Sequence, residues 1–268
     1  MNKIRSLWSG GGHAVLGWLQ IPAALHAEAL ARCGYDGLVV DLQHSPTDFA
    51  TAVAMMTAIE AGGSEPFVRV ATNDASDIMK LLDCGAYGVI CPMIDTAAQA
   101  RSFASALHYP PRGTRSFGPR RPLLRYGPDY PRIASETIVA LAMIETATAL
   151  QNLAEILAVD GIDGVFIGPA DLALALGAAP QADSTDPRVV AAVRTIRLSA
   201  HAHGKRVGIF CAGADFARDK LEEGFDLVSI TPDLAMLTHM ARTSLEQVRQ
   251  GARRKTPSGG NDNRAGGG

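Results

Sequence analysis

The chain has 268 residues, of which 47% are hydrophobic and 19% charged, a composition that indicates a folded globular protein and excludes a disordered one. Its 25 basic and 27 acidic side chains leave a formal net charge of -2, which argues against nucleic acid as the main partner because phosphate binding requires a concentrated basic surface. The four cysteines lack the spacing of a zinc site or a redox pair, and no apolar run is long enough to span a membrane. We therefore expect a cytoplasmic protein that binds neither nucleic acid nor membrane.

Short apolar runs alternate along the chain with stretches of helical length. The runs expected to be strands are residues 15–20, 37–42, 67–70, 88–93, 138–144, 164–167, 207–210 and 227–230. The stretches expected to be helices are residues 23–33, 48–61, 74–84, 96–107, 147–158, 187–203, 214–223 and 234–250. Continuous apolar runs are typical of parallel strands that are buried on both faces. Eight such units predict an α/β protein of the (β/α)8 TIM-barrel class, because a doubly wound sheet usually has five or six strands.

Local residue types mark the boundaries of these elements. Side chains suited to helix N-caps stand within Pro46–Thr47–Asp48, Thr72–Asn73–Asp74, Asp95–Thr96 and Thr185–Asp186–Pro187. Glycines suited to a left-handed helix end stand at Gly34, Gly62, Gly85 and Gly224. The connection over residues 109–135 is rich in proline and arginine and too long for a simple linker. We expect one barrel domain over residues 1–254, followed by a disordered, glycine-rich tail over residues 255–268.

Two carboxylates are expected at the carboxyl ends of neighbouring strands, which form the active face of this fold. Glu145 closes the fifth predicted strand, and Asp171 follows the sixth. Two converging carboxylates without a compensating lysine suit a hard divalent cation. Alternatively, each carboxylate caps the helix that begins beside it, near Thr146 and near Leu172. The metal site is favoured because both residues fall on the same rim.

Further polar residues are expected on the same rim. Arg69 lies within an apolar strand, where it either forms a buried ion pair with Asp41 or grips a carboxylate or a developing oxyanion. His44 is either an ordinary loop residue or a general base. The turn after the sixth strand presents backbone N–H groups that favour an anionic ligand, and it comprises Gly168, Pro169, Ala170 and Asp171.

Six motifs occur in the order found in one known family. They are LVVDLQH at 38–44, FVRV at 67–70, LLDCG at 81–85, YPPRG at 109–113, MIE at 143–145 and GIDGVFIGPADL at 161–172. Over residues 16–245 the chain resembles the HpcH/HpaI aldolase family, the class II, metal-dependent pyruvate aldolases. The last motif is the most specific of the six.

The resemblance implies cleavage, or formation, of 4-hydroxy-2-oxo acids to pyruvate or an analogue such as hydroxypyruvate, plus an aldehyde. It implies that Glu145 and Asp171 hold Mg²⁺, Mn²⁺ or Co²⁺, and that the N–H groups of Ala170 and Asp171 bind the substrate carboxylate. It also implies that His44 is the base and Arg69 stabilises the enolate-like transition state. Five lysines, none at a strand end, agree with chemistry that needs no Schiff base.

Other roles implied by the resemblance are less direct. Asp83 would raise the basicity of His44, and Asp41 would support the site. Trp18 is expected to form a wall of the pocket, only because it lies at the end of the first strand. Met143 is expected beside the substrate.

Two residues depart from the family pattern. Many members have glutamine at the position of Met143 and glutamate at the position of Gln43, which indicates a difference in the accepted substrate or in contacts to metal-bound water. Residues 115–121 of the long connection are expected either to reach over an active site, of the same chain or of a neighbour, or to form an ordered surface loop. The family further implies a homohexamer, a trimer of dimers, in which the last helix is exchanged between subunits; that helix could equally pack on its own barrel.

Two other readings of the sequence stay open. On the same fold, the chain could be an oxaloacetate decarboxylase or condensing enzyme similar to macrophomate synthase, or a relative of the citrate lyase β subunit. In a different class, it could be a catalytically silent barrel that acts as a binding protein. The complete set of polar rim residues argues against a silent barrel.

Overall fold

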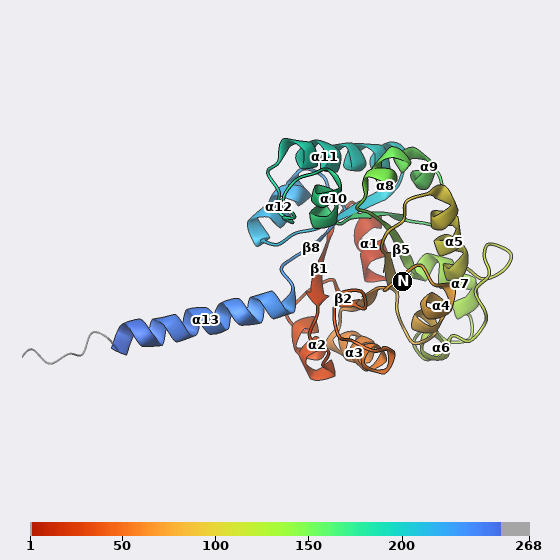
Figure 1. Cartoon of the computed structure of the whole chain (residues 1–268). Coiled ribbons are helices and arrows are strands. Elements are labelled where there is room, and N and C mark those ends of the chain that lie inside the picture. Colours follow the sequence, from red (N-terminus) through yellow and green to blue (C-terminus); the bar gives the residue numbers. More distant parts are fainter. Residues whose placement is uncertain (1, 253–268) are drawn as a thin grey trace, which may run out of the picture. The chain divides into compact units, whose positions relative to one another are not determined.

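Eight parallel strands close into a barrel in chain order in the computed structural model, which describes residues 2–252 (Figure 1). The strands are β1 (Ala14–Leu19), β2 (Gly37–Asp41), β3 (Glu65–Arg69), β4 (Gly88–Cys91), β5 (Val139–Ile144), β6 (Gly164–Ile167), β7 (Arg206–Phe210) and β8 (Leu227–Ser229). Each predicted strand is present, with ends that match the prediction or differ from it by at most two residues. The TIM-barrel prediction is therefore confirmed.

Helices follow the strands along the chain, and those between β1 and β8 cover the outside of the barrel. Those expected from the sequence are α2 (Ala24–Ala31), α3 (Phe49–Gly62), α4 (Ala75–Asp83), α5 (Ala97–Leu107), α8 (Ala147–Gln151), α9 (Leu153–Leu157), α11 (Pro187–Ala202), α12 (Ala214–Glu222) and α13 (Asp233–Ala252). Those not expected are α1 (Lys3–Ser9), α6 (Arg120–Tyr126) and α7 (Tyr130–Thr137). All three have eight residues or fewer, too short to show a clear helical period in the sequence. The helix considered near Leu172 is α10 (Pro169–Ala175), which begins three residues earlier.

The strand register brings the two candidate charged residues of β2 and β3 side by side. Asp41 is the direct partner of Arg69, and both are the last residues of their strands. In the same way, Met143 pairs with Phe166 across β5 and β6. Because all strands are parallel, these residues lie at the carboxyl-terminal rim of the barrel.

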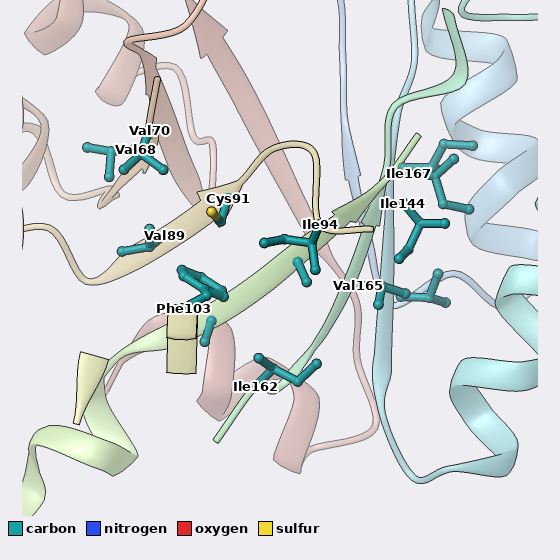
Figure 2. Packing of buried hydrophobic residues seen from close by; sticks show 14 of the residues in the cluster. Val68, Val70, Val89, Cys91, Ile94, Phe103, Ile144, Ile162, Val165 and Ile167 are labelled. Carbon is teal, nitrogen blue, oxygen red and sulfur yellow. The ribbon is translucent and has the colours of Figure 1, made fainter. Parts of the chain in front are cut away.

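Two apolar layers form the core. The barrel interior is filled by side chains that include Leu16, Val39, Phe67, Ile90, Leu141, Phe166 and Leu227. The helix α1 packs Ile4 and Trp8 into the same cluster and so closes the amino-terminal end of the barrel. Outward-facing strand residues such as Val68, Val89, Val165 and Ile167 pack with helix residues such as Phe103 (Figure 2). The rim residues therefore stand on a scaffold that is packed on both sides.

Most predicted helix caps are present. The side chains of Asp48, Asp74, Thr96 and Asp186 each accept a hydrogen bond from a backbone N–H in the first turn of α3, α4, α5 and α11. One predicted helix end is wrong by one residue: Gly63, with φ of 93°, takes the left-handed conformation instead of Gly62. A Cβ at Gly62 would lie 2.4 Å from the Cβ of Ala31, so this glycine permits the close contact of α3 with α2.

The long connection between α5 and β5 lies at the amino-terminal end of the barrel. Arg125 bonds the buried carboxylate of Glu65, the first residue of β3, over 2.8 Å and 3.0 Å. Arg121 bonds Glu60 near the end of α3. Residues 115–121 therefore do not cover the active face of their own chain, because that face is at the opposite end of the strands. Their reach over the site of a neighbouring chain stays a prediction.

The chain divides into two units, the barrel up to Asp233 and a second unit from Leu234 that contains the rest of α13. The predicted disordered tail over residues 255–268 lies outside the described residues. Among residues 2–252, no helix combines the length and apolar character needed to cross a lipid bilayer.

Candidate active site

A cavity of about 180 Å³ opens at the carboxyl-terminal rim of the barrel. Its walls combine apolar and polar side chains from six of the βα units. They are Trp18, Gln20, His44, Arg69, Met143, Phe166, Gly168, Pro169, Ala170, Asp171 and Phe210. Trp18, Met143 and Phe166 belong to the interior cluster, so the floor of the cavity is the top layer of the barrel core. The structure thus brings most of the predicted site residues to one small space.

Arg69 and Asp41 form a buried bidentate ion pair at this rim. Arg69 Nε donates to Asp41 Oδ1 over 2.9 Å, and a terminal nitrogen donates to Oδ2 over 2.6 Å. Burial alone would raise the pKa of Asp41, but the hydrogen bonds and charge of Arg69 outweigh it and hold the pKa below its ordinary value. Arg69 also lines the cavity, so both roles considered for it from the sequence are compatible.

Asp41 organises the loop that carries the histidine. Its Oδ1 accepts the backbone N–H groups of Gln43 and His44 over 3.1 Å and 3.3 Å. Its Oδ2 also accepts the indole N–H of Trp18 over 3.3 Å, and the Arg69 guanidinium lies 4.9 Å from the indole centre. A single fully buried carboxylate therefore orients Arg69, Trp18 and the backbone of His44, whose side chain lines the cavity.

Glu145 follows from the end of β5 and is only 2% exposed. Its Oε1 accepts the backbone N–H of Met93 over 2.8 Å. Burial raises the pKa of Glu145, and the nearby negative charge of Asp171 adds to the increase, whereas the Met93 bond and Arg69 oppose it. The helix that follows is capped by the hydroxyl of Thr146, so Glu145 is not the cap considered from the sequence.

Asp171 is an exposed residue in the first turn of α10, where it lines the cavity. The N-cap position of α10 is Gly168, so Asp171 is not the cap either. The carboxylates of Glu145 and Asp171 lie close enough for one to disfavour ionisation of the other. Neither carboxylate is needed for a helix end, which leaves both available for a ligand.

The donor set at this rim fits a divalent cation. Two neighbouring carboxylates carry repulsive charge that a hard cation would neutralise. In the loop after β2, Gln43 has a buried amide oxygen, Oε1, without a hydrogen-bond partner within residues 2–252. Across that same range, no group of three or more His, Cys, Asp or Glu side chains is arranged for a metal ion. A cation at Glu145 and Asp171 would therefore complete its coordination with water or substrate oxygens.

Asp83 lies far from the other predicted site residues of its own chain. It ends α4, a helix that returns from the active face, so it lies at the amino-terminal end of the barrel. Its carboxylate accepts a hydrogen bond over 2.8 Å from the fully buried Arg115 of the long connection. Within one chain the structure does not bring Asp83 and His44 together.

Four residues of the site were missed from the sequence. Gln20, Phe166 and Phe210 stand at or just after strand ends, so the rule that selected Arg69 would also have found them. Met93 contributes only its backbone N–H, and no sequence pattern predicts that contact.

The fold and the site define a class of protein: a (β/α)8-barrel enzyme in which an arginine, a histidine and an aspartate line one small cavity, with a buried glutamate near the aspartate. The sequence pattern of the HpcH/HpaI aldolase/citrate lyase family matches residues 15–240. The chain belongs to this family, which confirms the resemblance seen in the sequence, and it is accordingly a carbon–carbon lyase.

Two curated relatives align over most of their length. The hydroxypyruvate/pyruvate aldolase of Rhizorhabdus wittichii is 62% identical over 249 residues, covering 93% of this chain and 99% of the relative. The 4-hydroxy-2-oxo-heptane-1,7-dioate aldolase of Salmonella paratyphi A is 39% identical over 227 residues, covering 84% of this chain and 86% of the relative.

Solved structures agree with the fold. The crystal structure of an HpcH/HpaI aldolase/citrate lyase family protein from Burkholderia cenocepacia has a TM-score of 0.85 and 29% identity, covering 93% of this chain and all of that one. The citrate lyase β subunit of M. tuberculosis, in complex with oxaloacetate and magnesium, has a TM-score of 0.54 and 20% identity, covering 86% of this chain and 93% of that one. At that identity, the second likeness concerns the fold alone.

Proposed function

We propose that the protein is a divalent-metal-dependent aldolase that cleaves or forms 4-hydroxy-2-oxo acids, with pyruvate or hydroxypyruvate and an aldehyde as the other reactants. The observation that carries this proposal is the carboxylate pair of Glu145 and Asp171 at the rim of a small cavity that Asp171 and Arg69 line. The 62% identity to a hydroxypyruvate/pyruvate aldolase supports the choice of keto acid. A cavity of about 180 Å³ suits a small keto acid better than a large substrate.

Glu145 and Asp171 are the residues proposed to hold the cation, which we propose to be Mg²⁺, Mn²⁺ or Co²⁺. When bound, such an ion supplies Lewis-acid polarisation of the 2-oxo group. The partnerless Oε1 of Gln43 supports a role as acceptor for a water molecule at this site. Because many family members have glutamate at this position, contacts of Gln43 to metal-bound water would be weaker than theirs.

Arg69 and His44 are proposed to act on the reacting atoms. When the C3–C4 bond breaks, its electron pair moves into the C2–C3 fragment and negative charge grows on the C2 oxygen. Arg69 can donate to that oxygen with the terminal nitrogen that Asp41 does not engage. His44 takes the proton of the C4 hydroxyl, directly or through water, as the aldehyde forms. The proton that His44 took, delivered directly or through water, then goes to C3 and completes pyruvate.

The rest of the cavity is proposed to orient the substrate and exclude water. The backbone N–H groups of Ala170 and Asp171 belong to the first turn of α10, where amides lack partners within the helix, and they are proposed to bind the substrate carboxylate. Gly168 and Pro169 let the chain pass close to the substrate. Trp18 and Met143, each 2% exposed, form apolar walls beside it.

Asp83 is proposed to act only between chains. Because it lies at the opposite end of its own barrel, raising the basicity of His44 would require the Asp83 of a second copy. We propose that the protein is a homohexamer, as the family resemblance implies, with α13 exchanged between subunits. A cytoplasmic location is supported by the four cysteines, all of which are free thiols in the structure.

The proposed function predicts that the purified protein forms 4-hydroxy-2-oxo acids from pyruvate or hydroxypyruvate and aldehydes in the presence of metal. Treatment with EDTA should abolish product formation, and added Mn²⁺ or Co²⁺ should restore it. Without a cation, the two negative carboxylates cannot stabilise the negative charge that develops on the C2 oxygen. Formation of the keto-acid product is measured by coupled assay or chromatography against a panel of aldehydes.

The same assay separates the alternatives. Oxaloacetate decarboxylation without any aldol reaction would favour the alternative hypothesis of an enzyme similar to macrophomate synthase. Absence of both reactions with every metal would contradict the proposed function and favour a silent barrel. The variant Glu145→Gln, which keeps the size of the side chain, should lower metal affinity at least about a hundredfold and remove activity.

A further inference from the structure

Met93 has an unusual backbone conformation in the loop that follows β4. Its φ is 56°, and within residues 2–252 it is the one residue other than glycine with a positive φ. Methionine is not among the residues that adopt this left-handed region readily, because its Cβ crowds the following carbonyl oxygen. The side chain is 49% exposed, so burial of the side chain does not explain why the backbone is held this way.

The conformation has a clear consequence for Glu145. The backbone N–H of Met93, in the loop after β4, donates to Glu145 Oε1 over 2.8 Å. Glu145 stands at the end of the neighbouring strand β5, where its carboxylate is almost fully buried. A buried carboxylate oxygen needs a donor, and the Met93 amide is one of the influences that lower the pKa of Glu145 against the effect of burial.

The other oxygen of Glu145 is confined from the opposite side. A Cβ built on Gly168, the residue after β6, would lie 2.5 Å from Glu145 Oε2 and 3.1 Å from Glu145 Cβ. No side chain larger than hydrogen fits between this backbone and the carboxylate. The loop after β4 and the backbone after β6 therefore enclose the carboxylate between them, one with a hydrogen bond and the other with close contact.

We infer that Met93 is a positioning residue whose left-handed backbone engages one oxygen of Glu145 so that the other, beside Gly168, is presented to the cation. The inference rests on the proposed function, because it assigns Glu145 to the metal. The role belongs to the backbone and not to the methionine side chain. Any residue that tolerates a positive φ should therefore serve, and any residue that resists it should not.

A series of substitutions at Met93 tests this assignment through metal binding without substrate. Mn²⁺ affinity is measured on the metal-free protein by the electron paramagnetic resonance signal of the free ion. Met93→Leu and Met93→Gly keep the N–H and allow the conformation, so their affinities should stay within about threefold of wild type. Met93→Val should bind about tenfold more weakly, because a β-branched residue populates the left-handed region poorly and only the competent fraction binds.

Thermal unfolding separates the effect of backbone strain at Met93 from the effect of its side-chain contacts. In the metal-free protein, Met93→Gly should raise the midpoint of thermal unfolding, because glycine removes the cost of the left-handed conformation. Met93→Leu is the matched control for Met93→Val, since both are apolar and differ in branching at Cβ. Circular dichroism confirms that each variant is folded, as expected for substitutions at a half-exposed position.

The opposite contact is tested with Gly168→Ala. The added methyl group would overlap Oε2, so Mn²⁺ affinity should fall at least about tenfold while the barrel still folds. Two outcomes would overturn the inference and leave the proposed function intact. One is equal Mn²⁺ affinity across the Met93 series. The other is weaker binding by Met93→Gly and Met93→Leu with unchanged binding by Met93→Val. Failure of the wild-type protein to bind Mn²⁺ would overturn both.

Discussion

Arg69 pairs with Asp41 through two nitrogen atoms and is proposed to act in the reaction through the third. Its bidentate pair with Asp41 is buried, with the Asp41 side chain fully inaccessible and that of Arg69 10% exposed. Removing one partner of such a pair leaves a buried charge without a counter-ion. The free energy lost in this way is larger than the net stabilisation that the intact pair provides. Folding and activity should therefore both depend on Arg69, and a suitable second substitution should separate them.

The substitution Arg69→Ala should lower the free energy of unfolding by about 3 to 5 kcal/mol, because Asp41 is left buried and unpaired. It should also lower kcat through loss of the donor to the C2 oxygen, by about a hundredfold or more. Urea denaturation and steady-state kinetics measure the two effects on the same preparation.

The double variant Asp41→Asn, Arg69→Ala is the matched control. Replacing the carboxylate by a neutral amide removes the unpaired charge, so much of the lost stability should return while kcat stays low. Recovery of activity together with stability would contradict a direct role for Arg69 in the reaction.

His108 links three segments at the amino-terminal end of the barrel. It follows α5, its Nδ1 lies 3.1 Å from the hydroxyl of Ser135 in α7, and its Nε2 donates to the carbonyl of Gly161 over 2.9 Å. Burial lowers the pKa of His108, and the positive charges of Arg112 and Arg5 lower it further. The long connection is thus attached to the barrel partly through a neutral imidazole.

This environment predicts a loss of stability in mild acid. Because the pKa of His108 is lower in the folded protein than its ordinary value of 6.5, the unfolded state binds the proton more readily. The contribution is therefore present above about pH 6.5 and is lost as the pH falls through the folded pKa. The free energy of unfolding should drop more between pH 7.5 and pH 5.5 in wild type than in His108→Gln, as measured by urea denaturation. Equal drops would show that His108 does not titrate in this way.

Short elements were the hardest to anticipate. The helices α6 and α7 lie within the long connection, which is rich in proline and arginine. Their position is set by buried contacts such as those of Arg115 with Tyr130 and Asp83, and of Arg125 with Glu65. Such contacts join residues that are distant in the sequence, so local periodicity does not predict them.

The two ends of the barrel have different roles. The carboxyl-terminal rim carries the cavity and its polar residues, whereas the amino-terminal end carries α1, the long connection and Asp83. Separation of the proposed Asp83–His44 pair within one chain makes the oligomeric state relevant to catalysis. The helix α13, taken by itself, has an apolar stripe that includes Leu237, Met240 and Val248, which are 55%, 62% and 70% exposed.

An apolar helix face of this kind predicts association between copies of the chain. The substitution Leu237→Glu should shift the protein to a smaller species in sedimentation velocity, because a charge on this face opposes burial. The variant Gln250→Glu adds the same charge on the opposite side of α13 and should leave the wild-type sedimentation unchanged. A wild-type protein that sediments as a monomer would contradict the proposed hexamer.

The barrel class could be predicted from the alternation of apolar runs and helical stretches, since burial on both faces leaves a continuous apolar pattern in each strand. The rim residues could be predicted as well, because the end of each strand is visible as the end of its apolar run. Asp41, His44, Arg69, Glu145 and Asp171 were all selected in this way, and the structure places them at one rim.

Contacts between side chains required the folded chain. Strand register determines that Arg69 pairs with Asp41. The folded chain also shows that Glu145 does not cap a helix. The direction in which α4 returns determines which end of the barrel holds Asp83. The left-handed backbone of Met93 could not be predicted from the residue type, because methionine does not favour a positive φ. Local sequence reports which residues are buried and where a strand stops, whereas distances across strands arise only when the barrel closes.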